Sequence, residues 1–280
     1  MLTAFRRIDQ QRFGPWALVT GASSGIGREF ARQLAANGVN VALAARRRPV
    51  LDEVGRDLAA RYGIEYRCLQ VDLATSGFLR TITEATNDLD IGIVVSNAGD
   101  MVLGAFLAST HDSLLDEIRV NAETHLSLTH HFGQRLARRG RGGILLVSSI
   151  AGLQPVPFVA NYAATKAYTL ALGEALHHEL APTGVNVTVL VPGATDTPMI
   201  TRFGADQTPM RRMIMPVQAC VSDALAALAA NRPVRISGRM NRATIAVLPR
   251  TARRRIFGAM NASMATRMSQ ATLPAAHTVE

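Results

Sequence analysis

The sequence has few of the features that several protein classes require. Its two cysteines, Cys68 and Cys220, form neither a disulfide framework nor a pair at metal-binding spacing. No apolar run approaches the roughly 18 residues that a membrane-spanning helix needs. The N-terminal segment lacks the apolar stretch and small-residue cleavage site of a secretory signal. We therefore expect an intracellular, cytoplasmic protein.

Lysine is almost absent. Lys166 is the single lysine among 30 basic residues, and all the others are arginine. A guanidinium differs from a compact ammonium in shape, hydration and donor geometry. The one lysine is therefore either a remnant of a compositional bias or a position where an ammonium is needed, and its surroundings decide between the two.

What is present indicates a folded α/β domain. The chain has 280 residues, of which 48% are hydrophobic and 18% charged, which excludes wholesale disorder. Apolar runs predict strands at 16–20, 39–45, 66–72, 91–97, 143–149 and 185–191, with an edge strand at 234–238. Helical patterns run from the first loop to Asn37 and over 49–62, 75–88, 112–139, 161–181 and 250–268. We expect a doubly wound parallel sheet, a Rossmann fold, in a single domain.

Positive charge is concentrated at the C-terminal end. The net charge is +9, and residues 231–280 hold nine arginines against one acid, Glu280. No aromatic interleaving or nucleic-acid motif occurs there, so we expect no specific nucleic-acid partner. A solvated basic surface and a peripheral contact with an anionic membrane or an acidic protein both stay open. We expect 1–230 to be the cofactor-binding and catalytic domain and 231–280 an extension packed on it.

A glycine-rich loop follows the first predicted strand. Residues 20–27 read T-G-A-S-S-G-I-G, with Gly21, Gly25 and Gly27 at G-x-x-x-G-x-G spacing. Such a loop turns tightly, lets the backbone approach a pyrophosphate and directs a helix N-terminus at it. Glycines also occur in plain turns, but the strand before and the helix after favour a dinucleotide site.

The end of the second predicted strand discriminates between the nicotinamide dinucleotides. An acid there accepts the ribose hydroxyls of NAD, whereas an arginine suits the 2′-phosphate of NADP. The segment 43–48 reads L-A-A-R-R-R, with Ala45 where the acid would stand and Arg46 and Arg47 next. A solvated basic loop is the alternative. We expect NADP(H) to be preferred over NAD(H).

Lys166 belongs to a proton-transfer set. Tyr162 and Lys166 lie four residues apart in a predicted helix and so share a face. Ser149 ends a predicted strand, and strand ends of this kind meet at one edge of the sheet. A phenol has a pKa near 10, so it needs a neighbouring ammonium to favour its anion. Tyr-x-x-x-Lys alone is often a plain surface pair. Together with Ser149 and the glycine loop it indicates acid–base catalysis.

These motifs together resemble the short-chain dehydrogenase/reductase family, from about Trp16 to Met199. T-G-A-S-S-G-I-G (20–27), N-A-G (97–99), Y-A-A-T-K (162–166) and P-G-A-T-D-T (192–197) fall in order. Ser96 departs from the pattern, since many members carry a second asparagine there. A weaker likeness, in residues 14–27 and 89–99, is to the branch of 3-oxoacyl-CoA reductases and 17β-hydroxysteroid dehydrogenases.

The resemblance implies residue roles. Asp72 would contact the adenine, Asn97 would support the sheet beside the cofactor, and Asn121 would hold a water in a proton relay. Lys166 would also bond the nicotinamide ribose, and Thr197 would approach the carboxamide. The expected catalytic residues are Asn121, Ser149, Tyr162 and Lys166. The expected cofactor-binding residues are Gly21, Ser23, Ser24, Gly25, Ile26, Gly27, Arg46, Asp72, Asn97, Tyr162, Lys166, Pro192, Gly193 and Thr197.

A methionine-rich loop follows these motifs and is expected to cover the substrate. It contains the apolar residues Met199, Ile200, Phe203, Met210, Met213, Ile214 and Met215, and the arginines Arg202, Arg211 and Arg212. Methionines form a deformable apolar wall, which favours a lipophilic carbonyl or alcohol such as a 3-oxoacyl thioester, a steroid or a polyketide. Simple packing of the loop onto the protein is the alternative.

Two function classes follow. The first is an NADP(H)-dependent oxidoreductase, and the second is a dinucleotide-sensing binding protein whose basic tail contacts a partner. The catalytic set favours the first. By the family resemblance, the helices at 112–139 and 161–181 form a dimer interface, which implies a homodimer or homotetramer. His130, His131, His177 and His178 lack a third ligand at sensible spacing, so we expect no metal site. Asp90 and Asp100, which flank the fourth predicted strand, are expected to be solvated loop acids.

Overall fold

The computed structural model describes residues 8–204, 211 and 214–272, with side chains up to residue 266. Its core is a seven-stranded parallel sheet with the order β3-β2-β1-β4-β5-β6-β7. The strands are β1 (Trp16–Thr20), β2 (Asn40–Ala45), β3 (Tyr66–Gln70), β4 (Ile91–Ser96), β5 (Gly142–Val147), β6 (Val185–Val191) and β7 (Val234–Ile236). The expected doubly wound parallel sheet is confirmed. The order reverses between β1 and β4, which is where such sheets bind ligands.

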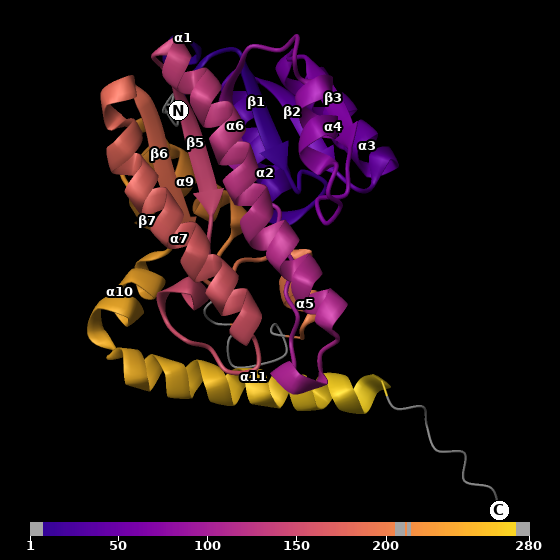
Figure 1. Ribbon diagram of the computed structural model, residues 1–280, viewed down its shortest axis with the longest axis vertical. Coiled ribbons are helices and arrows are strands. Elements are labelled where there is room, and N and C mark those ends of the chain that lie inside the picture. The colour runs from indigo at the N-terminus through magenta and orange to yellow at the C-terminus, as the bar shows by residue number, and fades with distance from the viewer. Residues whose placement is uncertain (1–7, 205–210, 212–213, 273–280) are drawn as a thin grey trace, which may run out of the picture.

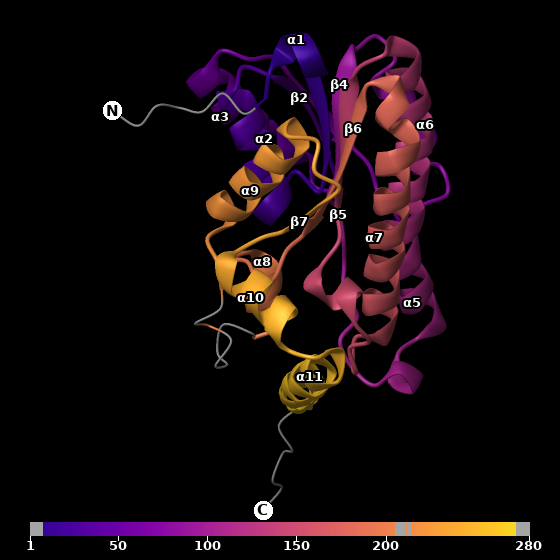
Figure 2. The same cartoon turned by 90° about the vertical axis from the view of Figure 1, so that its left-hand side faces the viewer.

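Helices cover both faces of this sheet (Figures 1 and 2). The longer ones are α2 (Gly25–Ala36), α3 (Arg48–Tyr62), α4 (Phe78–Ala85), α5 (His111–Ile118), α6 (Thr124–Arg139), α7 (Ala160–Leu180), α9 (Val217–Ala229), α10 (Arg239–Val247) and α11 (Arg250–Thr272). Helices α2, α3 and α9 pack on one face, and α4, α6 and α7 on the other. This two-sided cover explains why the strands are apolar along their length.

Side chains of the central strands alternate between the two layers. Ala17 and Val19 of β1 belong to the cluster with α2, α3 and α9, whereas Leu18 belongs to the cluster with α4 and α6. All three are fully buried. The period of two in a strand produces this alternation, so both faces of β1 contribute to the core.

The C-terminal part of the chain contributes to the same body. β7 pairs with β6 at the edge of the sheet, and α11 lies across the end of the molecule toward which the strands point (Figure 1). The carboxyl ends of the strands, where the ligand site is expected, therefore face α11. Among the described residues, no helix is long and apolar enough to cross a membrane.

Candidate active site

The glycine-rich loop after β1 forms a cradle at the N-terminus of α2. Gly21 and Gly25 have φ values of +68° and +55°, a conformation that favours glycine. A Cβ on Gly27 would lie 2.3 Å from the Gly21 carbonyl oxygen and 2.6 Å from Asn97 Nδ2. Ser24 caps α2 without a side-chain hydrogen bond, and the first turn, which includes Ile26, has no acid. This open, acid-free helix end fits a pyrophosphate.

Thr20 joins the glycine-rich loop to the end of β4. Its Oγ1 accepts hydrogen bonds from the backbone N–H groups of Asn97 at 3.0 Å and Ala98 at 3.1 Å. The Asn97 Nδ2 donates to the Thr20 carbonyl oxygen at 2.9 Å. Because β1 and β4 meet at the point where the strand order reverses, these bonds fix the floor of the site.

Two arginines border the cradle at the end of β2. Arg46 is exposed and has no hydrogen bond or ion pair within the described part of the chain, whereas Arg47 Nη2 donates to Ser23 Oγ at 3.1 Å. Arg48 instead pairs with Asp52 at 2.8 Å. Asp72 follows β3, is exposed, and accepts from the Ala74 N–H at 3.0 Å.

Ser149, Tyr162 and Lys166 converge at the carboxyl end of β5. Lys166 Nζ donates to the Val147 carbonyl oxygen at 3.0 Å and lies 5.7 Å from the centroid of the Tyr162 ring. Ser149 Oγ accepts from the Ala151 N–H at 3.1 Å, and Ser149 lies close enough to the phenol to influence its pKa. A hydroxyl, a phenol and an ammonium thus meet, as proton transfer to a carbonyl oxygen requires.

Burial shifts both titrating groups toward their neutral forms. It raises the pKa of Tyr162 to about 12, while the hydrogen bond from Ser149 acts in the opposite direction. It lowers the pKa of Lys166 to about 8, and the nearby Glu117 carboxylate opposes this. The Lys166 ammonium was expected to lower the pKa of the phenol, whereas desolvation raises it.

Asn121 lies in a π-helical turn, Arg119–Glu123, that interrupts the helix predicted over 112–139. Its Oδ1 accepts from the Asp100 N–H at 2.9 Å, and its Nδ2 donates to the Asp100 carbonyl oxygen at 2.8 Å. A Cβ on Gly99 would lie 3.1 Å from Lys166 Nζ and 3.2 Å from Asn121 Oδ1. The side chains of Asn121 and Lys166 therefore approach each other over Gly99. The Asn121 carbonyl oxygen accepts from the Thr169 hydroxyl at 3.1 Å.

Sequence reasoning missed a buried carboxylate beside this set. Glu117 is 2% exposed. Its Oε1 accepts from the Val102 N–H at 2.8 Å, and its Oε2 accepts from Asn161 Nδ2 at 2.6 Å. Desolvation raises its pKa. An acid on an otherwise ordinary helical pattern gives no signal of this role, because its partners come from distant segments.

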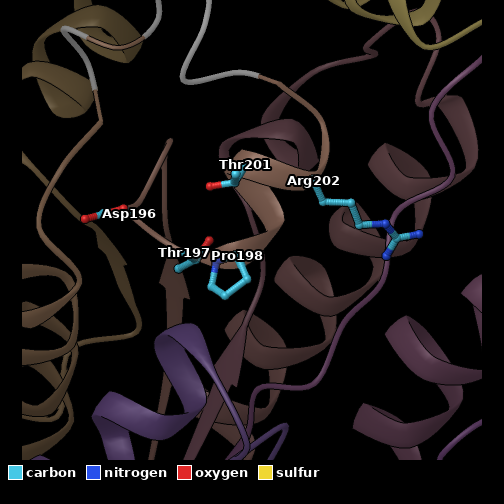
Figure 3. Close-up of a pocket in the computed structure, with 5 residues that line it drawn as sticks. All are labelled: Asp196, Thr197, Pro198, Thr201 and Arg202. Atoms are coloured by element: carbon cyan, nitrogen blue, oxygen red, sulfur yellow. The ribbon is translucent and has the colours of Figure 1, made fainter. Parts of the chain in front are cut away.

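The segment after β6 faces the glycine-rich loop. Figure 3 shows a pocket lined by Asp196, Thr197, Pro198, Thr201 and Arg202. A Cβ on Gly25 would lie 3.2 Å from Thr197 Cγ2, so the two segments face each other closely. The Pro192 carbonyl oxygen accepts from the Ile150 N–H at 2.9 Å. Gly193 leaves room for Asn241 of α10, whose Nδ2 would lie 2.3 Å from a Cβ there.

An apolar cluster adjoins Tyr162. Tyr162, Met101, Leu103 and Phe257 pack against Val156, Val159 and Ala163. Met101 and Leu103 also pack against Phe203 and Met264, together with Met199 and Ile200. Phe257 and Met264 belong to α11, so this helix contributes to the apolar packing beside Tyr162. Met210, Arg212 and Met213 of the expected substrate loop lie outside the described residues.

The two acids that flank β4 both form ion pairs. Arg202 of the helix α8 (Pro198–Arg202) pairs with Asp100 at 2.9 Å, and Arg139 pairs with Asp90 at 2.7 Å. Both acid side chains are solvent-exposed, as expected, and the ion pairs are an addition that the sequence did not indicate. The pair between Arg202 and Asp100 links the loop after β4 to the segment after β6, on opposite sides of the site.

Fold and site together define an oxidoreductase that binds a nicotinamide dinucleotide. The profile of the short chain dehydrogenase family matches residues 15–208. The chain therefore belongs to the short-chain dehydrogenase/reductase family, as its motifs indicated. Members of this class act on hydroxyl and carbonyl groups with NAD(P), and we assign that activity to this chain.

Individual relatives agree with this assignment. The chain is 35% identical over 192 residues to a very-long-chain 3-oxoacyl-CoA reductase of Neurospora crassa, covering 66% of this chain and 58% of that protein. A structure of 7β-hydroxysteroid dehydrogenase superposes with a TM-score of 0.83 and 28% identity, covering 89% of this chain and 98% of the other. A short-chain dehydrogenase of Sphingobium yanoikuyae in complex with NADPH has a TM-score of 0.75 and 29% identity, covering 95% and 99%.

Proposed function

We propose that the protein interconverts a ketone and a secondary alcohol on a lipophilic substrate with NADP(H), using Tyr162 as the general acid and base. The observation that carries this proposal is the convergence of Tyr162, Ser149 and Lys166 beside an apolar cluster. The names of two relatives, a steroid dehydrogenase and a long-chain acyl reductase, support a lipophilic substrate.

The chain's own residues would position the substrate and move the proton. Ser149 donates a hydrogen bond to the substrate oxygen, and Tyr162 gives that oxygen its proton during reduction or takes it during oxidation. The Lys166 ammonium stabilises the phenolate that remains after reduction. Asn121 and Lys166, which approach each other over Gly99, hold the water through which Tyr162 regains its proton. The nicotinamide supplies or accepts the hydride when it is bound.

NADP(H) rather than NAD(H) is favoured by the charges at the end of β2. Arg46 is free to bind a phosphate, and Arg47 already contacts Ser23 of the glycine-rich loop. Ala45 is buried and neutral where an acid would repel a phosphate. The NADPH complex of the Sphingobium relative agrees with this preference. We place Asp72 at the adenine, and Pro192, Gly193 and Thr197 beside the nicotinamide.

Two surfaces are proposed for contacts beyond the substrate. Ile118, Leu126 and Tyr168 are exposed on α5, α6 and α7, which favours a homodimer or homotetramer through these helices.

Val247 and Ile256 are exposed near the arginines of α10 and α11, which favours a peripheral contact of the 231–280 extension with an anionic membrane. Sedimentation with anionic liposomes that is unchanged in a Val247→Asp variant would dismiss the second contact. The cytoplasmic location stays a prediction.

The test of the proposed function is a screen of ketones for NADPH oxidation. We expect steroid ketones and 3-oxoacyl thioesters to be reduced faster than sugars. Tyr162→Phe should lower kcat at least about 100-fold because it removes the acid, while NADPH binding is retained. Tyr66→Phe, at the amino end of β3 and so at the edge of the sheet opposite the site, is the matched control. Full turnover in Tyr162→Phe would refute the proposed acid, and a preference for sugars would refute the lipophilic substrate.

A further inference from the structure

A cationic side chain of α11 is partly buried without a partner. The Nε and Nη1 atoms of Arg253 are inaccessible to water and have no hydrogen-bond partner among the described residues. The sequence has no acid between Asp223 and Glu280, and Asp223 is paired with Arg235 and Arg242. Burying guanidinium N–H groups without an acceptor is costly, so this position is suited to an anion that the described residues do not supply.

Arg253 lies on the face of α11 that packs onto the apolar cluster beside Tyr162. Phe257 follows one helical turn later and therefore projects from the same face, and it packs in the same cluster as Tyr162. Further along this face, Asn261 Nδ2 donates to the Pro157 carbonyl oxygen at 3.3 Å, and Met264 packs against Phe203. Figure 2 shows α11 end-on beneath the body of the protein. The spacing therefore puts Arg253 one helical turn before the residue by which α11 joins this cluster.

We propose that Arg253 binds an anionic group of the substrate, a carboxylate or a phosphate, remote from the reacting carbonyl. This inference rests on the proposed function, and it adds that the lipophilic substrate is an anion. A guanidinium binds either group through two parallel hydrogen bonds. The apolar side chains beside Arg253 then hold the hydrophobic part, with the carbonyl directed at Tyr162.

The experiment compares charged and neutral forms of one ketone. Its probes are a steroid ketone with a carboxylate, the methyl ester of that ketone, and a 3-oxoacyl-CoA thioester, each assayed with NADPH. In the wild type, kcat/KM should be higher for the carboxylate than for the ester. In Arg253→Gln this ratio should fall at least about tenfold, mainly through KM, as the loss of a charge-assisted hydrogen-bond pair predicts. If Arg253→Gln lowers kcat/KM for the 3-oxoacyl-CoA thioester alone, the anion is identified as a phosphate.

Arg254→Gln is the matched control, because Arg254 is the adjacent arginine and is exposed. It should leave the ratio unchanged. Arg253→Lys keeps the charge and should retain part of the preference for the carboxylate over the ester. If Arg253→Gln fails to fold, this variant still tests the proposal. The proposal would be overturned if Arg253→Gln lowered kcat/KM equally for the carboxylate and its ester. It would also be overturned if kcat/KM for the carboxylate and the thioester were both unchanged.

Failure of the proposed function would give a different result. If the wild type reduces none of the three ketones, the proposed substrate class fails, and calorimetric binding of the steroid carboxylate then tests Arg253 directly. Binding that Arg253→Gln abolishes and Arg254→Gln retains would support the anion site. No binding by the wild type would refute it.

Discussion

Glu117 accepts a hydrogen bond from Asn161, the residue directly before Tyr162, at 2.6 Å between Oε2 and Nδ2. The same carboxylate accepts from the Val102 N–H in the loop that follows β4. A single buried acid thus ties the start of the helix that carries Tyr162 to the loop after β4. Its charge also raises the pKa of Lys166.

Glu117→Gln is expected to impair catalysis without unfolding the protein. A glutamine has one acceptor oxygen for two donors, so its amide N–H₂ would face either the Val102 N–H or Asn161 Nδ2, donor against donor. It would also remove the negative charge that favours the Lys166 ammonium. We expect kcat to fall about tenfold and the alkaline limb of the pH–rate profile to move to lower pH. Glu123→Gln, at an exposed position of the same helical segment, should do neither. An unchanged pH profile would contradict the role of Glu117 as a positioning residue.

Arg46→Ala is expected to weaken NADPH binding about tenfold or more, and to leave NADH binding unchanged, because only NADPH carries the 2′-phosphate. Arg47→Ala should act in the same direction. Arg48→Ala is the control, since Arg48 is paired with Asp52. Fluorescence titration with each dinucleotide measures the effect. Tighter binding of NADH than NADPH by the wild type would refute the assigned preference.

Gly27→Ala is expected to disrupt the cofactor cradle. The new methyl group would lie 2.3 Å from the Gly21 carbonyl oxygen, so the loop must move, at a cost of about 1–3 kcal/mol in the free energy of unfolding. Dinucleotide binding should be lost with it. Gly133→Ala in α6, where a Cβ would meet Ile144 at an ordinary 3.7 Å, should be neutral or slightly stabilising. Unfolding in denaturant checks both, and equal stability of the two variants would contradict the packing argument.

Lys166 makes stability depend on pH in a defined direction. Burial lowers its folded-state pKa from 10.5 to about 8, so between these values the unfolded chain binds more protons than the folded one. The free energy of unfolding should therefore rise with pH across that window, by about 3 kcal/mol relative to Lys166→Met. Urea unfolding of the wild type and of Lys166→Met from pH 7 to 10.5 gives the difference in their free energies of unfolding. If this difference does not change with pH, the ammonium is not desolvated.

The fold was predictable because its signals are local. Buried strands read as apolar runs, and β1, β6 and α7 begin or end within a residue of the predicted bounds. The predicted strands that end in Asp72, Asn97 and Ser149 run one or two residues too far. At those positions the backbone has left the sheet, and the side chains lie at the ligand site. The pattern of apolar residues does not predict where a strand ends in this way.

What escaped prediction depends on contacts between distant segments. The π-helical turn around Asn121 contains neither glycine nor proline. It coincides with two hydrogen bonds that Asn121 exchanges with Asp100 and one that its carbonyl oxygen accepts from the Thr169 hydroxyl. The pKa of Tyr162 depends on how thoroughly the surrounding side chains exclude water, which the spacing of Tyr162 and Lys166 does not reveal. Glu117 was missed for the same reason, since its partners lie in other elements.

The residues assigned to proton transfer and helix α11, Arg250–Thr272, belong to different stretches of this chain. The family match ends at residue 208, after every residue assigned to proton transfer, whereas Phe257 and Met264 of α11 pack against apolar clusters from beyond that match. Under the proposed role of Arg253, an exchange of that one helix between relatives would change substrate preference and leave the reactive groups untouched. Substrate range would then change late in the sequence, without renewed selection on the catalytic machinery.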